Sequence, residues 1–356
     1  MKTIVIAEAG VNHNGDLARA LQMIAVARHC GADVVKFQTF RADQLATANA
    51  QKAGYQVANT GDAGSQLEML RALELSRESH VTLAKECRHL GIRFMSTAFD
   101  SPSLAFLSSF DMPAIKIPSG DVTCGPLLLQ AARLRRPLIV STGMCTLADV
   151  EAALGVIAFG LTHDTDPQTT RDFAQAYRSE AGQAALQAHV TLLHCVTQYP
   201  ASPDSVNLRA MATLRAAFGL PVGYSDHTAG IEISIAAVAC GATIIEKHFT
   251  LDRTLPGPDH AASLEPGELG ALVAAIRNVE RALGRAIKAP VDVELENLKI
   301  ARRSLVAARP IRKGEVLTAE MLVSKRPASG VSPMQLWDLL GRSARRDFAT
   351  DEPIEP

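Results

Sequence analysis

The sequence predicts an α/β protein built as a (β/α)8 TIM barrel, followed by a small β-rich domain. Eight short apolar or β-branched runs occur in order, and helix-like segments separate most of them. The runs are almost continuously apolar, which is typical of parallel strands covered by helices on both faces. Nearly every run becomes polar at its C-terminal end, where barrels of this kind build their sites.

The strands and helices of the predicted barrel account for residues 1–285. The expected strands are TIVIAEAG (3–10), DVVKFQTF (33–40), IRFMSTAF (92–99), AIKIPSG (114–120), LIVSTG (138–143), VTLLHCV (190–196), PVGYSDH (221–227) and ATIIEKHF (242–249). Apolar residues at helical spacing predict helices at Leu17–Cys30, Leu147–Phe159 and Ile231–Ala239. Gly31 is a suitable C-terminal cap for the first of these.

Two polar segments interrupt the alternation of strands and helices. We expect Arg41–Gly64 to form a long, irregular loop over the C-terminal face of the barrel. His163–Gln183 precedes the sixth strand, and we expect a peripheral, partly helical insertion on the opposite face.

The composition changes after the barrel. Residues 286–302 read as a linker with a short helix at Asp292–Arg302, and residues 303–356 read as a small β-rich domain. Its expected short strands and turns are SLVAARPI, then RKGEVL with a turn at Lys313-Gly314, then LVSKRPASG. A domain of this size is marginally stable alone, so we expect it to pack on its own barrel or on a partner's.

Composition and charge exclude several classes of partner. The 356 residues include 36 Lys and Arg against 37 Asp and Glu, so no nucleic acid and no membrane surface is expected as a partner. No apolar run is long enough for a signal or transmembrane segment. The six cysteines are scattered and form no C-x-x-C pair, which predicts a cytoplasmic protein without a disulfide framework or zinc knuckle.

Two histidines end neighbouring strands of the predicted barrel. His227 and His248 could share a divalent ion and leave positions for water and a substrate oxygen. The alternative is a pair of ordinary hydrogen-bonded polar residues. His13, in the loop after the first strand, is a third candidate ligand, although an isolated loop histidine more often caps a turn.

Two lysines lie inside apolar strands. An unpaired ammonium is costly there, so Lys36 and Lys116 need anionic partners. Either Glu8 or Asp226 could serve structurally, and a substrate phosphate or carboxylate could serve functionally.

Hydroxyl groups converge from four different strand ends. They belong to Thr97, Ser119, Ser141 and Ser225. Together with the lysines, and without a G-x-x-x-x-G-K-[ST] loop, they favour a small phosphorylated acid over a nucleotide. A Schiff-base aldolase acting through Lys116 or Lys247 is the main alternative within the enzymes.

At these same residues the sequence resembles the sialic acid synthase family. The barrel motifs are IAEAGVNHNGD (6–16), VKFQTF (35–40), STAFD (96–100), KIPSGD (116–121), STGM (141–144), LLHCVTQYP (192–200), GYSDHT (223–228), EKHFTLD (246–252) and GPDHAASLEP (257–266). RRSLVAARPIRKGE (302–315) and SKRPASG (324–330) resemble the family's antifreeze-like, or SAF, domain.

The resemblance implies a condensation of phosphoenolpyruvate with an N-acetylmannosamine-type sugar to a nonulosonic acid and phosphate. SQLEML (65–70) and LDRTLPGPDH (251–260) look most like bacterial N,N'-diacetyllegionaminate synthases, which use 2,4-diacetamido-2,4,6-trideoxymannose. The alternative within the family is an N-acetylneuraminate synthase that uses N-acetylmannosamine. A non-catalytic sugar- or ice-binding protein is the alternative outside the enzymes.

The resemblance also assigns roles to residues. His227 and His248 would hold a divalent metal, Mn²⁺ in the family, and Glu8 or Glu246 would carry a proton. Phosphoenolpyruvate would be held by Lys36, Thr97, Lys116, Ser119, Ser141, Thr197 and Ser225. The sugar would face Gln38, Tyr199 and Asp259.

One further residue implies an oligomer. Arg326 would reach from the small domain of one subunit into its partner's barrel, which implies a domain-swapped homodimer. The sequence departs from the family beside the site, with Thr197 where many members have Asn and Gln198 in place of an acidic residue.

Overall fold

The computed structural model describes residues 2–60 and 64–355 of the chain. Contacts within the chain divide it into two compact units, Met1–Gly284 and Arg285–Pro356. Within the described residues, no helix has both the length and the apolar character needed to cross a membrane.

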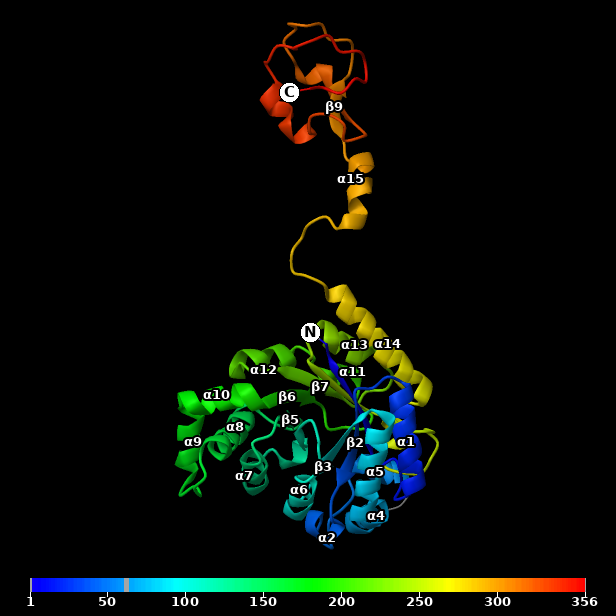
Figure 1. The fold of residues 1–356 in the computed structure, drawn as a ribbon, viewed down its shortest axis with the longest axis vertical. Helices are drawn as coiled ribbons and strands as arrows, with labels where there is room; N and C mark the ends of the chain where they lie inside the picture. The colour runs from blue at the N-terminus through cyan, green and yellow to red at the C-terminus, as the bar shows by residue number, and fades with distance from the viewer. Residues whose placement is uncertain (1, 61–63, 356) are drawn as a thin grey trace. The chain divides into compact units, whose positions relative to one another are not determined.

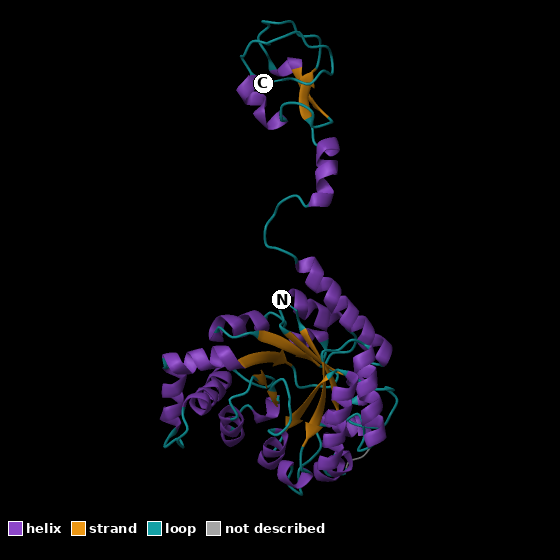
Figure 2. Cartoon of the chain, in the orientation of Figure 1, coloured by secondary structure: helices purple, strands orange, loops and turns teal. Residues whose placement is uncertain are grey.

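The first unit is a closed barrel of eight parallel strands in sequential order, as predicted (Figures 1 and 2). Its strands are β1 (Ile4–Gly10), β2 (Val34–Thr39), β3 (Arg93–Ala98), β4 (Ile115–Ile117), β5 (Leu138–Ser141), β6 (Val190–Cys195), β7 (Val222–Asp226) and β8 (Ile244–His248). The apolar runs set these strands because both faces of the sheet are buried. The fourth strand is shorter than expected, since Ser119 already begins a 3₁₀ turn, η1 (Ser119–Asp121).

Helices surround the barrel on its outer face (Figure 2). The helices of this unit, some of which lie in the loops over the strand ends rather than around the barrel, are α1 (Leu17–His29), α2 (Ala42–Leu45), α3 (Gly54–Thr60), α4 (Gln66–Leu73), α5 (Arg77–Leu90), α6 (Ser101–Leu107), α7 (Gly125–Arg133), α8 (Leu147–Thr162), α9 (Thr170–Arg178), α10 (Glu180–His189), α11 (Pro203–Val206), α12 (Ala210–Phe218), α13 (Glu232–Ala239) and α14 (Pro266–Leu283), with the 3₁₀ turn η2 (His260–Ala262). The Asp16 carboxylate caps α1 at its N-terminus, and the left-handed Gly31 (φ +81°) follows its C-terminal cap.

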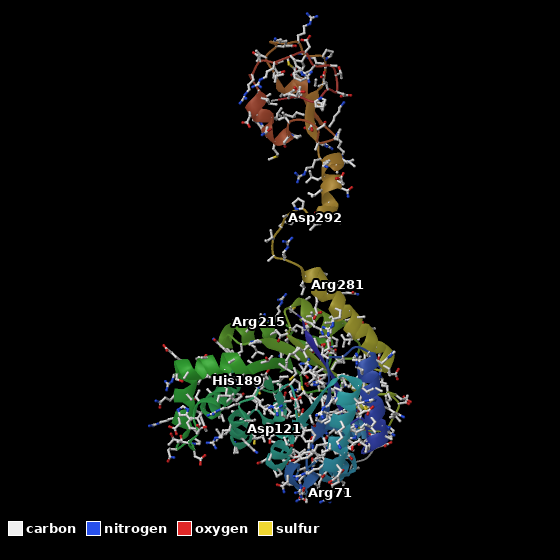
Figure 3. All side chains as sticks on the ribbon, in the orientation of Figure 1. Arg71, Asp121, His189, Arg215, Arg281 and Asp292 are labelled. Carbon is white, nitrogen blue, oxygen red and sulfur yellow. The ribbon has the colours of Figure 1, made fainter. Side chains whose placement is uncertain are left out.

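The interpretation of one polar segment needs correction, and the helical content predicted for the other is confirmed. Arg41–Gly64 is not a single irregular loop, because α2 and α3 lie within it; residues 61–63 lie outside the described residues. His163–Gln183 is partly helical, as predicted. It contains α9 and the start of α10, which ends at His189 (labelled in Figure 3) directly before β6.

Strand register decides which polar residues face the barrel interior. In parallel strands, paired residues point to the same face of the sheet. The two residues in each of the pairs Glu8–Lys36, Gln38–Thr97, Thr97–Lys116, Ser225–Glu246 and Glu8–His248 therefore share the interior face of the barrel. The residues that alternate with them along the strands face the surrounding helices.

The second unit contains a small domain with its own core. Its elements are η3 (Asp292–Glu294), α15 (Leu295–Ala301), β9 (Ser304–Ala307), η4 (Ala319–Met321), β10 (Leu322–Lys325), η5 (Pro333–Gln335) and α16 (Leu336–Leu339). The strands β9 and β10 pair antiparallel and pack with residues such as Leu305, Leu322 and Phe348. The expected turn at Lys313-Gly314 is confirmed, with Gly314 at φ +86°. The flanking residues of RKGEVL do not form a regular strand, because among the described residues this segment pairs only through an isolated bridge from Val316 to Ser343.

Candidate active site

One cavity of about 380 Å³ opens at the C-terminal ends of the barrel strands. All but two of the residues to which the family resemblance assigns a role line it. They are Lys36, Gln38, Thr97, Lys116, Ser119, Ser141, Thr197, Tyr199, Ser225, His227, Glu246, His248 and Asp259.

The two exceptions lie elsewhere. Glu8 is buried behind the lining, where it contacts Lys36 and accepts a hydrogen bond from Gln38 Nε2 at 3.2 Å. Its position is that of a residue that orients its neighbours. Arg326 is an exposed residue of the second unit.

A charged cluster forms the floor of the cavity. Lys36 Nζ lies 2.6 Å from Glu8 Oε2 and 3.6 Å from Glu246 Oε2. Lys116 Nζ lies 3.6 Å from Glu246 Oε1. The Glu246 carboxylate therefore stands between two buried ammonium groups, and it satisfies neither at close range.

The hydroxyl groups extend this cluster through direct hydrogen bonds. Lys36 Nζ donates to Thr97 Oγ1 at 2.9 Å, and Lys116 Nζ donates to Ser141 Oγ at 2.7 Å. The Ser225 hydroxyl donates to Glu246 Oε1 at 3.0 Å. Each hydroxyl is thus held beside a charged group, in a position from which it can also contact a bound anion.

The balance of burial and charge differs among the four ionisable groups. Burial lowers the pKa of Lys116, and Glu246 only partly compensates. Burial acts in the same direction on Lys36, but the nearby carboxylates of Glu246 and Glu8 outweigh it and raise its pKa. Of the two lysines in the cavity, Lys116 is therefore the one whose charge is less fully compensated, and an anionic substrate beside it would stabilise that charge.

The two carboxyl groups shift in opposite directions. Burial would raise the pKa of Glu246, but Lys116 and Lys36 outweigh it and lower that pKa. For Glu8, burial outweighs the neighbouring Lys36 and raises the pKa. Glu246 is therefore the more strongly ionised of the two, and it is also the one that lines the cavity.

A second buried ion pair lies outside the barrel wall and corrects two hypotheses. Asp226 does not pair with the interior lysines; its Oδ2 atom lies 3.0 Å from Lys247 Nζ, and both side chains are fully buried. Lys247 consequently faces away from the cavity, so it is not available for a Schiff base. Ser96, Thr142 and His194 also form hydrogen bonds outside the cavity.

The loop after β5 packs tightly against the phosphoenolpyruvate residues expected from the sequence. The Gly143 amide donates to Ser119 Oγ at 3.0 Å. A Cβ atom at position 143 would lie 2.5 Å from Thr197 Oγ1, 2.8 Å from Ser119 Oγ and 3.1 Å from Cys195 Sγ. Only glycine leaves room for these groups to converge.

The geometry of the histidine pair fits a metal site. The His227 and His248 ring centroids lie 5.7 Å apart. His227 Nδ1 lies 2.6 Å from the Val196 carbonyl oxygen, so this nitrogen carries the proton and Nε2 keeps its lone pair. His248 Nδ1 is buried and has no hydrogen-bond partner among the described residues.

Both imidazoles are suited to act as neutral ligands. Burial is the largest cause that lowers the pKa of His227 and of His248, and a neutral ring is the metal-binding form. Within residues 2–60 and 64–355, no group of three or more His, Cys, Asp or Glu side chains could hold a metal. The chain would supply two nitrogen ligands and leave the other positions to water or substrate. His13 does not join them; its Nδ1 accepts from the Gly15 amide, and it does not line the cavity.

Sequence reasoning missed the residues that α2, α3 and α4 bring to the cavity. The ring centroid of Tyr55, on α3, lies 5.0 Å from that of Tyr199. The ring centroid of Tyr199 in turn lies 4.1 Å from that of His227. Asn59 of the same helix donates to the Pro258 carbonyl at 2.6 Å, which ties α3 to the loop after β8. The length of the segment after β2 predicted that this segment lies over the C-terminal face of the barrel. It did not predict which of its residues face the cavity.

The fold and this cavity define an α/β-barrel enzyme with a pocket for a small anion. The chain belongs to the NeuB family, whose model matches residues 23–288, and a SAF domain matches residues 302–356. It is 44% identical to the N,N'-diacetyllegionaminic acid synthase of Campylobacter jejuni over 99% of both chains. It is 45% identical to the Legionella pneumophila enzyme of the same name, covering 96% of this chain and 90% of that one.

A solved structure shows the same architecture. The N-acetylneuraminic acid (sialic acid) synthetase of Leptospira borgpetersenii is 32% identical and superposes with a TM-score of 0.67. The match covers 84% of this chain and 90% of that one.

Proposed function

We propose that the protein condenses phosphoenolpyruvate with 2,4-diacetamido-2,4,6-trideoxymannose to N,N'-diacetyllegionaminate and phosphate. The observation that carries the proposal is a single cavity that combines two buried lysines, their hydroxyl partners and a histidine pair. The names of the Campylobacter and Legionella relatives support the choice of product.

The lysine and hydroxyl cluster binds phosphoenolpyruvate in this proposal. The phosphate and carboxylate groups carry negative charge, and the positive charge of Lys116 is less fully compensated than that of Lys36. The side chains of Ser119, Ser141 and Thr197 donate further hydrogen bonds to the same anion. These groups lie at the end of β5 or directly after β4 and β6, so little reorganisation accompanies binding.

The reaction forms one C–C bond and breaks one C–O bond. The methylene carbon of phosphoenolpyruvate attacks the aldehyde carbon of the open-chain sugar, and the aldehyde oxygen takes up a proton. Water adds to C2, and the resulting tetrahedral centre expels inorganic phosphate to leave the keto acid. Glu246 lines the cavity and is the carboxylate positioned to hold or move a proton.

The histidine pair would hold a divalent ion, which we propose is Mn²⁺. When bound, the ion supplies Lewis-acid polarisation of the aldehyde. His227 is oriented by its bond to the Val196 carbonyl, and the unpartnered His248 Nδ1 would be free to donate its lone pair to the ion. Gln38, Tyr199 and Asp259 then surround the space where the sugar binds.

We further propose a domain-swapped homodimer in the cytoplasm. The proposal assigns Arg326 of one subunit to the sugar bound in its partner's barrel. It gives the small domain, whose core is limited to a few side chains such as Leu305 and Phe348, a surface on which to pack. The described cysteines are all free, which is consistent with a reducing compartment.

The direct test is phosphate release with Mn²⁺ and phosphoenolpyruvate, comparing 2,4-diacetamido-2,4,6-trideoxymannose with N-acetylmannosamine. We expect release that requires both substrates, with a strong preference for the diacetamido sugar. A preference for N-acetylmannosamine would instead identify a neuraminate synthase. Trapping of Lys116 by borohydride in the presence of pyruvate would support an aldolase and contradict the proposal.

A further inference from the structure

The cavity has an apolar side that the proposed chemistry does not explain. A small hydrophobic cluster, separate from the main barrel core, is built on the loops and helices after β1, β2 and β3. Its buried members are Val11, Phe40 and Leu73, and its partly buried members are Leu45, Met69, Leu70 and Phe99. All of them line the cavity, and we call this cluster the apolar wall.

The apolar wall contrasts with the rest of the lining. Charged and hydroxyl side chains on β2 to β8 form the floor, whereas the wall presents aliphatic, thioether and aromatic groups. Such partly exposed apolar surface inside a polar site has a free-energy cost in water, which a ligand recovers when it covers the surface with apolar groups of its own.

Specific hydrogen bonds hold the wall in place. Ser65 and Glu68 form a capping box that starts α4. Glu74, the C-terminal cap of α4, accepts from the Ala42 amide at the start of α2 at 3.1 Å. The two helices that carry Leu45, Met69 and Leu70 are therefore fixed to each other, and the wall is pre-formed.

The proposed sugar has apolar groups at the end remote from its reacting carbon. The aldehyde carbon of the sugar must meet phosphoenolpyruvate near the floor of the cavity. The C4 to C6 end of the sugar therefore extends away from the floor. There the sugar carries an acetamido methyl on C4 and a methyl at C6, where N-acetylmannosamine has two hydroxyls. A hydroxyl placed against apolar side chains loses its water partners without gaining new ones.

We infer that Leu45, Met69 and Leu70 form a specificity subsite that receives the C4 acetamido and C6 methyl groups of the sugar. This inference rests on the proposed function, since it assumes that the sugar binds in this cavity. The subsite acts both by contact with the methyl groups and by exclusion of hydroxyls at the same positions.

The test uses polar substitutions of similar size, Met69→Gln and Leu70→Gln. Leu147→Gln is the matched control, because Leu147 is 45% exposed, begins α8 and does not line the cavity. Phosphate release is measured with the diacetamido sugar, with 2-acetamido-2,6-dideoxymannose and with N-acetylmannosamine. This series separates the C6 change from the C4 change.

We expect each wall variant to lower kcat/KM for the diacetamido sugar about tenfold or more, the range for one apolar group in a hydrophobic pocket. Its kcat/KM for N-acetylmannosamine should change less than threefold, and its KM for phosphoenolpyruvate should stay the same. The control should match the wild type with all three sugars. Thermal melting of each variant checks that it is folded.

Two results have different meanings. If the wild-type protein prefers the diacetamido sugar but both wall variants lose activity equally with all sugars, the specificity subsite is refuted and the proposed function stands. If the wild-type protein turns over none of the sugars, the proposed function itself fails.

Discussion

Replacing Gly143 by alanine tests whether the hydroxyls around it bind phosphoenolpyruvate. The substitution adds one methyl group at a position with no left-handed backbone requirement, so its effect is steric. The new Cβ would lie 2.5 Å from Thr197 Oγ1 and 2.8 Å from Ser119 Oγ. Both distances are shorter than van der Waals contact, so both hydroxyls must move.

The size of the effect follows from these distances. Restoring ordinary contact requires the two hydroxyls to retreat by roughly 1 Å, and a misplacement of that order costs about 10²-fold in rate. We therefore expect kcat/KM for phosphoenolpyruvate to fall about 10- to 100-fold, equivalent to about 1.4 to 2.8 kcal/mol. The overpacking should also lower the free energy of unfolding by about 1 to 3 kcal/mol.

Steady-state phosphate release at varied phosphoenolpyruvate and saturating sugar measures this effect. Gly125→Ala is the matched control, because a Cβ atom there meets nothing within 4 Å. The control should keep wild-type kinetics. A Gly143→Ala protein that keeps kcat/KM for phosphoenolpyruvate within twofold of wild type would refute the assignment of Ser119 and Thr197 to this substrate.

Three other predictions concern the buried charges and the metal. Lys247→Met leaves the buried Asp226 carboxylate without its ion-pair partner, so it should lower the free energy of unfolding by about 3 to 5 kcal/mol. The double variant with Asp226→Asn should recover part of this loss. Equal denaturation midpoints for the single and double variants would contradict the prediction. Asp33 is partly buried, but its bonds to Lys2 and Arg277 outweigh burial and hold its pKa below 3.8. The stabilisation that ionised Asp33 provides is therefore present above pH 3.8, and it is lost as the pH falls through the pKa of the folded state. Asp33→Asn should lower the free energy of unfolding in urea by about 1 to 2 kcal/mol at pH 7 and by less at pH 3. Dialysis against a chelator should abolish phosphate release and Mn²⁺ should restore it, whereas full activity of metal-free protein would remove the histidine pair from metal binding.

The barrel and most of its lining could be predicted from the sequence for a physical reason. Both faces of a barrel strand are buried, so each strand appears as a continuous apolar run, and strand ends were located to within a few residues. The polar ends then identified Lys36, Lys116 and the histidine pair together. The apolar wall could not be predicted in this way. The short helices that build it interrupt the alternation of strands and helices, and they are too short to show a clear helical pattern of apolar residues.

The direction in which each polar side chain points could not be predicted from the sequence either. At a polar strand end, some side chains point into the barrel and others point outward. The same polar residue types occur in both sets, so residue type alone does not distinguish them. On β7, Ser225 lines the cavity while Asp226 points to the helices. The alternation along a strand separates these two sets, but only when the register with a neighbouring strand shows which set is interior.

The outward-facing residues nevertheless act on the site through the backbone. Asp226 accepts hydrogen bonds from the Thr228 amide at 2.8 Å, the Thr228 hydroxyl at 2.7 Å and the Ser234 hydroxyl at 2.6 Å. Lys247 closes this network by donating to the Thr228 carbonyl. Because Asp226 and Thr228 flank His227 on both sides, the network fixes the turn that carries this candidate ligand. The buried ion pair is costly to desolvate, and the network around it holds the backbone on both sides of His227 in place.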